Sequence, residues 1–187
     1  SDNGPTYLNQ VDYEFFNSTG IFVNSRNTMK GSVREGGLRV PMIVSWPNII
    51  EKNSSSDHIS VFYDFFETAL DVANIKSPFA TDGISFFPEL KGEKQKKHKY
   101  LYWEYPASGG LQAIRMGKWK GIKSNLFKGK SKLKLFDLSL DHKELNDVSE
   151  YFPKIVSQLE KYLIEAHKTP SFEKFIIPSL ELEMLDI

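Results

Sequence analysis

Two short runs near the N-terminus hold the residue types most suited to chemistry. Residues 1–5 read Ser-Asp-Asn-Gly-Pro, and residues 30–41 begin with a lysine and continue through Glu-Gly-Gly. The adjacent carboxylate and amide of Asp2 and Asn3 can both bind a hard cation such as Ca²⁺. The ammonium of Lys30 can bind an anion as a point charge. Each run also has a plainer interpretation, because Asp-Asn-Gly is a common turn sequence and most lysines are simply solvated.

Two glycines follow the lysine and lead into an apolar run. Gly36 and Gly37 can take positive φ, and without side chains they let another group approach the backbone closely. Residues 40–46 are mainly apolar and are followed by Pro47, which predicts a buried strand. The chain is therefore expected to turn after Lys30 and then to enter a sheet.

The composition is that of an ordinary globular protein. Of 187 residues, 40% are apolar and 26% are charged. The net charge is zero, so neither nucleic acid nor a membrane surface is indicated as a partner, and any anion binding must be local. There is no cysteine, which excludes disulfides, thiolate ligands and a cysteine nucleophile from this sequence. No apolar run approaches the roughly 20 residues of a membrane-spanning helix, and the sequence does not open with the basic and apolar regions of a signal peptide.

The first half of the sequence predicts loops around one helix. Asp64 and Glu67 have the spacing of a capping box, and apolar residues continue at helical spacing to Ala73. Asn74 is suited to the left-handed position that ends a helix. Residues 91–99 form a basic run without aromatic residues and are expected to be a solvated connector rather than a nucleic-acid surface. The expected apolar face of the helix consists of Phe65, Phe66, Ala69, Leu70, Val72 and Ala73.

The second half predicts a small antiparallel sheet covered by a helix. Pro153 suits the first turn of that helix, and its apolar residues are expected to pack on the sheet. The polar residues 125–132 are expected to form a mobile hairpin loop, and the apolar tail beyond residue 170 is expected to be packed rather than free. The predicted strands are residues 100–105, a pair within 111–123 that turns at Gly117, and residues 133–138.

The two N-terminal runs, in this order, resemble the second half of the type I sulfatases, which are arylsulfatase-like members of the alkaline phosphatase superfamily. Similar residues continue at 82–88, at 100–104 and between 135 and 146. The resemblance covers nearly the whole sequence but only the C-terminal part of the family's length. It implies an α/β fold, namely the C-terminal piece of an alkaline-phosphatase-like sulfatase that ends in a small antiparallel sheet packed against a C-terminal helix.

The resemblance also implies domain boundaries and a parent enzyme. Residues 1–95 would be the last segment of the catalytic α/β domain, with residues 40–46 in its large sheet, and residues 96–187 would be a small C-terminal subdomain. The apolar tail would pack on a surface of the parent enzyme or on another chain. For a bacterial member, the resemblance implies a periplasmic or extracellular location.

Roles for individual residues follow from the resemblance. The matching Asp2 and Asn3 would be ligands of one Ca²⁺ (or Mg²⁺), and the matching Lys30 would contact the sulfate. The family's nucleophile is a formylglycine made from Cys or Ser in a Cys/Ser-x-Pro/Ala-x-Arg motif, which this sequence lacks. The resemblance places that group, and the other metal ligands, in a missing N-terminal segment. This chain alone is therefore predicted to hold half of the metal site and to be inactive.

The implied substrate is a sulfated small molecule or glycan, most similar to the carbohydrate sulfates of bacterial sulfatases. The small domain of such enzymes often lines the substrate cleft, and a histidine in a polar loop can lie at its rim. Each candidate is also explained as an ordinary sheet or surface residue. The candidate substrate residues are His58, Trp103, Glu104, Gln112 and Arg115.

Two other functions fit the same residues. A phosphodiesterase or phosphonate hydrolase of the same superfamily would share the metal scaffold and differ in the nucleophile motif. A non-catalytic module could instead bind a glycan or a protein partner through its second domain. Such a module would need neither Lys30 nor a metal ion.

Overall fold

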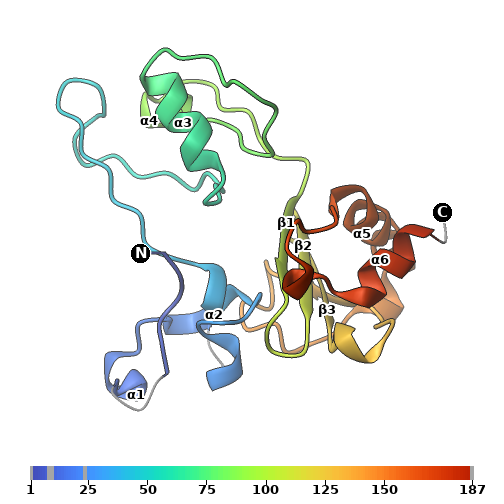
Figure 1. Ribbon diagram of the computed structural model, residues 1–187. Helices are drawn as coiled ribbons and strands as arrows, with labels where there is room; N and C mark the ends of the chain where they lie inside the picture. The colour runs from blue at the N-terminus through green and yellow to red at the C-terminus, as the bar shows by residue number, and fades with distance from the viewer. Residues whose placement is uncertain (1, 8–10, 23–24, 186–187) are drawn as a thin grey trace. The chain divides into compact units, whose positions relative to one another are not determined.

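The computed structural model describes residues 2–7, 11–22 and 25–185, which form two compact units (Figure 1). We call residues 1–41 with 100–187 the sheet unit and residues 42–99 the middle unit. The predicted domains, 1–95 and 96–187, divide the chain differently, because residues 1–41 group with the sheet. They stay a prediction for the boundaries of a longer protein.

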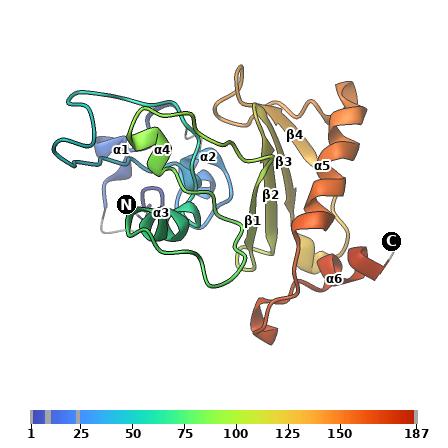
Figure 2. The same cartoon turned by 90° about the horizontal axis from the view of Figure 1, so that it is seen from above.

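The sheet unit is built on a four-stranded antiparallel sheet in the order β1-β2-β3-β4. The predicted strands are confirmed, and Gly117 makes the tight turn between β2 and β3 with a φ of 58°. In Figure 2 the sheet is seen with α2 on one side and α5 on the other. The strands are β1 (Leu101–Tyr105), β2 (Leu111–Met116), β3 (Trp119–Ser124) and β4 (Lys134–Asp137).

The sheet has two faces that are covered differently. Since alternate residues point to opposite sides, Ile114 and Leu135 face the long helix α5 (Pro153–Ala166), whereas Ala113 and Phe136 face Val33. We call these the helix face and the segment face. Further residues of the helix face are Tyr102, Met116 and Trp119, and further residues of the segment face are Trp103, Leu111 and Ile122.

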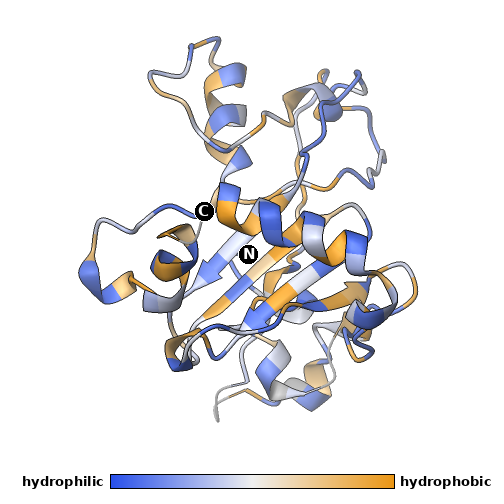
Figure 3. Ribbon diagram, turned by 90° about the vertical axis from the view of Figure 1, so that its right-hand side faces the viewer, coloured by the Kyte–Doolittle hydropathy of each residue, from blue (hydrophilic) through white to orange (hydrophobic). Residues whose placement is uncertain are grey.

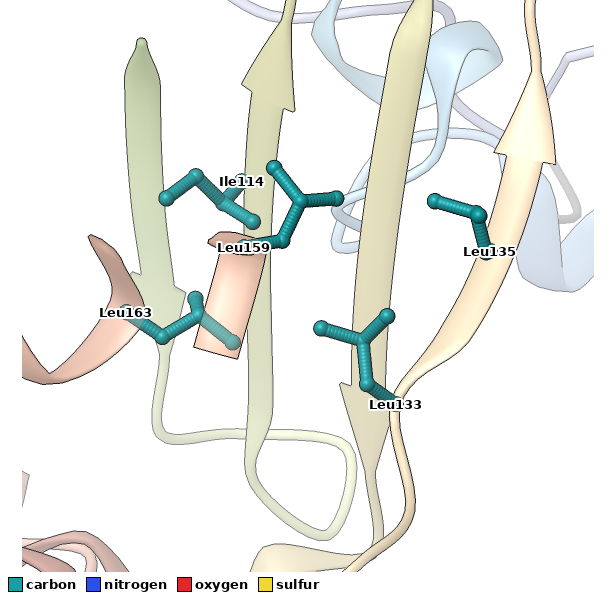
Figure 4. Close-up of a cluster of buried hydrophobic side chains, with 5 residues drawn as sticks. All are labelled: Ile114, Leu133, Leu135, Leu159 and Leu163. Carbon is teal, nitrogen blue, oxygen red and sulfur yellow. The ribbon is translucent and has the colours of Figure 1, made fainter. Parts of the chain in front are cut away.

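On the helix face, α5 packs its apolar residues into the centre of the sheet. Leu159 and Leu163 of the helix contact Ile114, Leu133 and Leu135, and all five are almost fully buried (Figure 4). Burying a leucine contributes about 1.5–3 kcal/mol, so this cluster is a main source of stability. The helix lying across the strands in Figure 3 carries both hydrophobic and hydrophilic stretches, as expected for a helix with one buried side. The predicted helix and its covering role are confirmed.

The C-terminal tail packs on the chain's own loop between β3 and β4. Ile177 and Leu180 are buried against Leu126, and Ser179 donates a hydrogen bond of 2.7 Å to the Leu126 carbonyl. The tail is thus not free, although its Phe172 and Leu185 are exposed, and its packing on the parent enzyme or on another chain stays a prediction. The hairpin loop predicted at 125–132 is confirmed, since it joins the antiparallel strands β3 and β4, but buried Leu126 fixes its beginning. The loop contains η3 (Leu126–Lys128), and the tail contains η5 (Glu173–Phe175) and α6 (Pro178–Leu185). A further single turn, η4 (Ser149–Tyr151), precedes α5.

The middle unit contains two short helices, α3 (Asp64–Val72) and α4 (Phe87–Leu90), joined by loops. Asn74 ends α3 with a φ of 54°, as predicted. The predicted capping box is wrong, since the buried Asp64 carboxylate instead accepts the backbone N–H groups of Val61 and Ile84. His98 lies 2.8 Å from the same carboxylate, so one residue of the basic run is tied to the unit. Burial opposes ionisation of Asp64, but these hydrogen bonds outweigh it and lower its pKa.

Two apolar segments of the middle unit are exposed, and for one of them the predicted buried strand at 40–46 is wrong. Residues 42–46 form no strand, and Ile43 is 94% exposed. A strand needs a neighbour to pair with, and all four described strands belong to the sheet unit. On the predicted apolar face of α3, Phe65 is 65% exposed and Phe66 is 43% exposed. Within the described ranges no helix is both long and apolar enough to span a bilayer.

The N-terminal part of the sheet unit is made of short turns. Among residues 2–7, 11–22 and 25–41, the longest helices are single turns. The glycine pair predicted to form a turn lies instead within α2, and neither glycine has a positive φ. The described elements are α1 (Tyr13–Phe16), η1 (Gly20–Phe22), η2 (Arg26–Thr28) and α2 (Glu35–Leu38).

Candidate functional site

Backbone hydrogen bonds bring the two N-terminal runs together. The Gly4 N–H donates to the Gly37 carbonyl at 2.9 Å, and the Lys30 N–H donates to the Pro5 carbonyl at 3.0 Å. The chain directly after Asp2 and Asn3 is therefore held beside Lys30 and α2. The structure places on adjacent loops the three residues predicted to bind metal and sulfate.

The contact between the runs requires glycine. A Cβ atom on Gly4 would lie 2.2 Å from the Gly36 carbonyl oxygen, and one on Gly37 would lie 2.5 Å from the Ser32 carbonyl oxygen. Both distances are far below van der Waals contact. The glycines therefore serve close backbone approach, which was one of their two predicted roles.

The side chains of this candidate site differ in their exposure, and the Asn3 Oδ1 atom is buried. Lys30 and Asp2 are exposed, and Asn3 is half-buried. The carboxylate and amide oxygens fit a hard cation, but Ca²⁺ takes six to eight oxygen ligands. Across residues 2–7, 11–22 and 25–185, no group of three or more His, Cys, Asp or Glu side chains is arranged to hold a metal ion. Asp2 and Asn3 can thus supply only part of a coordination shell.

A buried cluster of three charges joins the Lys30 run to the sheet. The Lys120 ammonium of β3 lies 2.7 Å from Glu35 Oε1 and 2.9 Å from Glu144 Oε1, and the lysine is fully buried. The second Glu144 oxygen accepts the backbone N–H of Glu35 at 2.8 Å. Burial opposes ionisation of Glu35, but Lys120 outweighs it, and the pKa of Glu35 falls to about 2. We call Glu35, Lys120 and Glu144 the three-charge cluster.

Three arginines surround this cluster, so that four cations lie around its two carboxylates. Arg39 Nε donates to Glu35 Oε2 at 2.7 Å, and Arg115 Nη1 lies 3.5 Å from the same oxygen. Arg34 Nη1 donates to the Glu144 carbonyl at 2.7 Å. Burial lowers the pKa of Arg115, and the negative charge of Glu35 counteracts part of that shift. Lysine and arginines from four places in the chain thus converge on two glutamates.

The predicted substrate residues fall in different places. Trp103 and Arg115 lie on the segment face with the Lys30 run, where the Trp103 ring is 6.0 Å from the Lys120 ammonium. Glu104 and Gln112 pair across β1 and β2 on the helix face, away from that run. His58 is half-buried in the middle unit, where its N–H donates to Ser56 Oγ. The sheet register therefore brings only Trp103 and Arg115 to the side of Lys30.

Glu104 and Gln112 belong to a second polar cluster, around His167 at the end of α5. His167 Nδ1 lies 2.5 Å from Glu104, and Nε2 lies 3.0 Å from Glu181 of α6. The Tyr102 hydroxyl donates to Glu104 and accepts from Gln112 Nε2 at 2.9 Å. Burial, followed by the charge of Glu104, raises the pKa of Tyr102, so its phenol stays neutral. This cluster fastens α6 to the sheet.

Sequence reasoning missed Lys120 and His167 as residues of interest. Lys120 stands in a predicted strand between Trp119 and Gly121 with no motif that marks it, and His167 follows the predicted helix with no motif around it. For Glu144 a signal was present, because it lies within the stretch that carried the family resemblance. Its place beside Glu35 could not be read from a separation of 109 residues.

Comparison with known proteins identifies the family. Residues 28–169 match the family described as N-sulphoglucosamine sulphohydrolase, C-terminal. The chain is 30% identical over 142 residues to an N-acetylglucosamine-6-O-sulfatase of Bacteroides thetaiotaomicron, with 70% of this chain and 25% of that protein covered. It is 30% identical over 154 residues to arylsulfatase K of Bos taurus, with 76% and 28% covered. The chain thus spans about a quarter of the length of these relatives.

Solved structures agree with the fold. One, a protein in complex with its substrate D-glucosamine-2-N,6-O-disulfate, matches with a TM-score of 0.61 and 25% identity, over 70% of this chain and 28% of that one. Another, bound to a neocarrahexaose, has a TM-score of 0.65 at 23% identity and covers 100% of this chain and 39% of its own. The predicted resemblance and the α/β sulfatase fold are confirmed. The chain belongs to the sulfatases, in the family of N-sulphoglucosamine sulphohydrolase C-terminal domains.

Proposed function

We propose that this chain is the C-terminal part of a sulfatase that hydrolyses carbohydrate sulfate esters, in which Lys30 contacts the sulfate and Asp2 and Asn3 help to hold a divalent cation. The observation that carries the proposal is the pair of backbone hydrogen bonds that places the Asp-Asn-Gly-Pro run beside Lys30. A cation site and an anion-binding ammonium on adjacent loops are the parts that an anionic ester requires.

Lys30 would act by binding charge. When a sulfate ester is cleaved, negative charge develops on the sulfuryl and leaving-group oxygens, and preorganised cations stabilise it. Lys30 presents an exposed ammonium on a backbone that is fixed through Pro5. Its position on this short turn lets it bind a sulfate oxygen as a point charge.

Asp2 and Asn3 would hold a Ca²⁺ or Mg²⁺ ion through one carboxylate and one amide oxygen. When bound, such an ion supplies Lewis-acid polarisation of the sulfate oxygens. The remaining ligands and the formylglycine nucleophile would come from the part of the relatives' length that this chain does not span. This chain contributes binding groups and no nucleophile.

The substrate class is proposed from the relatives. Their names include sulfatases of N-acetylglucosamine and N-acetylgalactosamine at the 6 position. We therefore propose a 6-O-sulfated amino sugar. A panel of N-acetylglucosamine 6-sulfate, N-acetylgalactosamine 6-sulfate and glucosamine-2-N,6-O-disulfate tests this choice directly by sulfate release.

The test of the site is Lys30→Ala in the full-length protein. Loss of one positioned charge stabiliser typically lowers kcat by about 10²–10³, and a similar loss of kcat/KM is expected here. Lys128→Ala is the matched control, because Lys128 is also an exposed lysine of the sheet unit. Equal activity of Lys30→Ala and the control would contradict the proposed role.

A further inference from the structure

We propose that the three-charge cluster is the positioning element of the anion site: it fixes the backbone that carries Lys30 and, through α2, the run that carries Asp2 and Asn3. The inference rests on the proposed function for its catalytic meaning. None of the three charged side chains is proposed to touch substrate, since all are buried.

The cluster connects three separate segments at one point. Glu35 lies in α2, Lys120 is the second residue of β3, and Glu144 lies in the loop after β4. Glu144 uses one oxygen for Lys120 and the other for the Glu35 backbone N–H, so it holds the first turn of α2 against the sheet. Removing one charge leaves its partners desolvated without compensation.

From α2 the connection runs by backbone contacts to the site. The Gly37 carbonyl at the far end of α2 accepts the Gly4 N–H, and the Pro5 carbonyl accepts the Lys30 N–H. Only the four residues 31–34 separate Lys30 from Glu35, the charged residue that anchors it. Gly4 and Gly37 are in direct backbone contact, with no side chain between them. A shift of Glu35 is therefore expected to move both Lys30 and the Asp2-Asn3 run.

Glu144 has an unusual backbone conformation for a residue with a side chain. Its φ is +55°, in the left-handed region that non-glycine residues rarely adopt. Glycine would relieve that conformation but would remove the carboxylate. The anchor is held further by Arg34, which donates to the Glu144 carbonyl at 2.7 Å.

The experiment uses the full-length protein with Glu35→Gln/Lys120→Met/Glu144→Gln, called the charge-free variant because it removes the three charges of the cluster. Neutral replacement of a whole buried ion cluster often keeps the fold, and the amide introduced at position 35 keeps an oxygen for Arg39 and Arg115. The control is Lys118→Met/Asp137→Asn, which removes a partly exposed ion pair of 2.6 Å on the same sheet. The first readout is hydrogen exchange of peptides covering residues 28–38. The charge-free variant should exchange faster there and keep the exchange of β2 and β3, whereas the control should match the wild type.

The second readout is inhibition by inorganic sulfate, measured in a double-mutant cycle with Lys30→Ala. Mispositioning should weaken sulfate binding about tenfold in the charge-free variant. In the charge-free background, Lys30→Ala should weaken sulfate inhibition by less than about a further twofold. The effects of coupled sites are non-additive, even though Lys30 and the cluster are not in contact. A purely structural cluster predicts multiplicative effects instead.

Unchanged exchange at residues 28–38, or multiplicative effects on sulfate inhibition, would overturn the inference. If Lys30→Ala leaves sulfate inhibition unchanged in the wild-type background, the proposed function fails. The exchange measurement then decides the positioning claim alone, because it needs no activity. The single variant Lys120→Arg keeps the positive charge beside both glutamates, and its exchange at residues 28–38 should stay as slow as in the wild type.

Discussion

The two faces of the sheet are stabilised by different physics. The helix face is a leucine-rich layer under α5, with its polar groups collected at one end around His167. The segment face is covered by irregular chain and places a fully buried lysine near its centre. Apolar packing tolerates small shifts, whereas ion pairs with hydrogen bonds fix a geometry. The face that carries the candidate site is the one that uses charges.

The largest effect is expected from Lys120→Met, which tests whether buried charges stabilise the segment face. Removing one partner of a buried ion pair typically costs about 3–5 kcal/mol. Here Glu144 would lose its lysine, and Glu35 would keep only Arg39 and Arg115. Chemical denaturation of the full-length protein measures the loss. The charge-free triple variant should recover most of it, and a single variant as stable as the wild type would show that the charges do not matter for stability.

On the helix face, Leu159→Ala tests the opposite mechanism. Leu159 is fully buried among Ile114, Leu135 and Leu163, and such a truncation costs about 2–5 kcal/mol through lost burial and a cavity. Exchange at residues 28–38 should stay slow in the folded variant, unlike in the charge-free variant. Faster exchange in both would mean that the two faces are not separable.

Acid should weaken the segment face selectively. The pKa of Glu35 is about 2 in the folded state against 4.5 for a free side chain, so its contribution is complete above pH 4.5 and is lost as the pH falls toward 2. The shift corresponds to about 3 kcal/mol. Comparing unfolding of the wild type and Glu35→Gln from pH 6 to pH 2 measures it. A wild-type slope that persists in the variant would assign the loss to other carboxylates.

The sequence predicts the helix face of the sheet better than the segment face. The β-prone strand sequences between turn residues and the helical spacing of Leu159 and Leu163 are local patterns, so the sheet and α5 were predictable. Lys120 occupies an inward position that pattern reasoning assigns to apolar residues. Its partners lie 85 residues before it and in a loop after it, and no local pattern encodes that meeting.

The candidate site was predictable through its motif and not through its geometry. Lys30, Asp2 and Asn3 were named from the family resemblance, but their approach depends on glycine contacts that spacing does not reveal. The predicted strand at 40–46 failed for a related reason, since pairing depends on a neighbour outside the local window. For Asp64, the capping prediction failed because burial turned its carboxylate toward Val61, Ile84 and His98.

The long separation between Glu35 and Glu144 has a consequence during synthesis. The ribosome must add 109 residues after Glu35 before its second anchor exists. At about 5–20 residues per second, the Lys30 turn stays unanchored for roughly 5–20 seconds after it is made. Slowing translation downstream of Glu35 would lengthen that interval, and a chaperone that recognises unanchored turns would have its opportunity there.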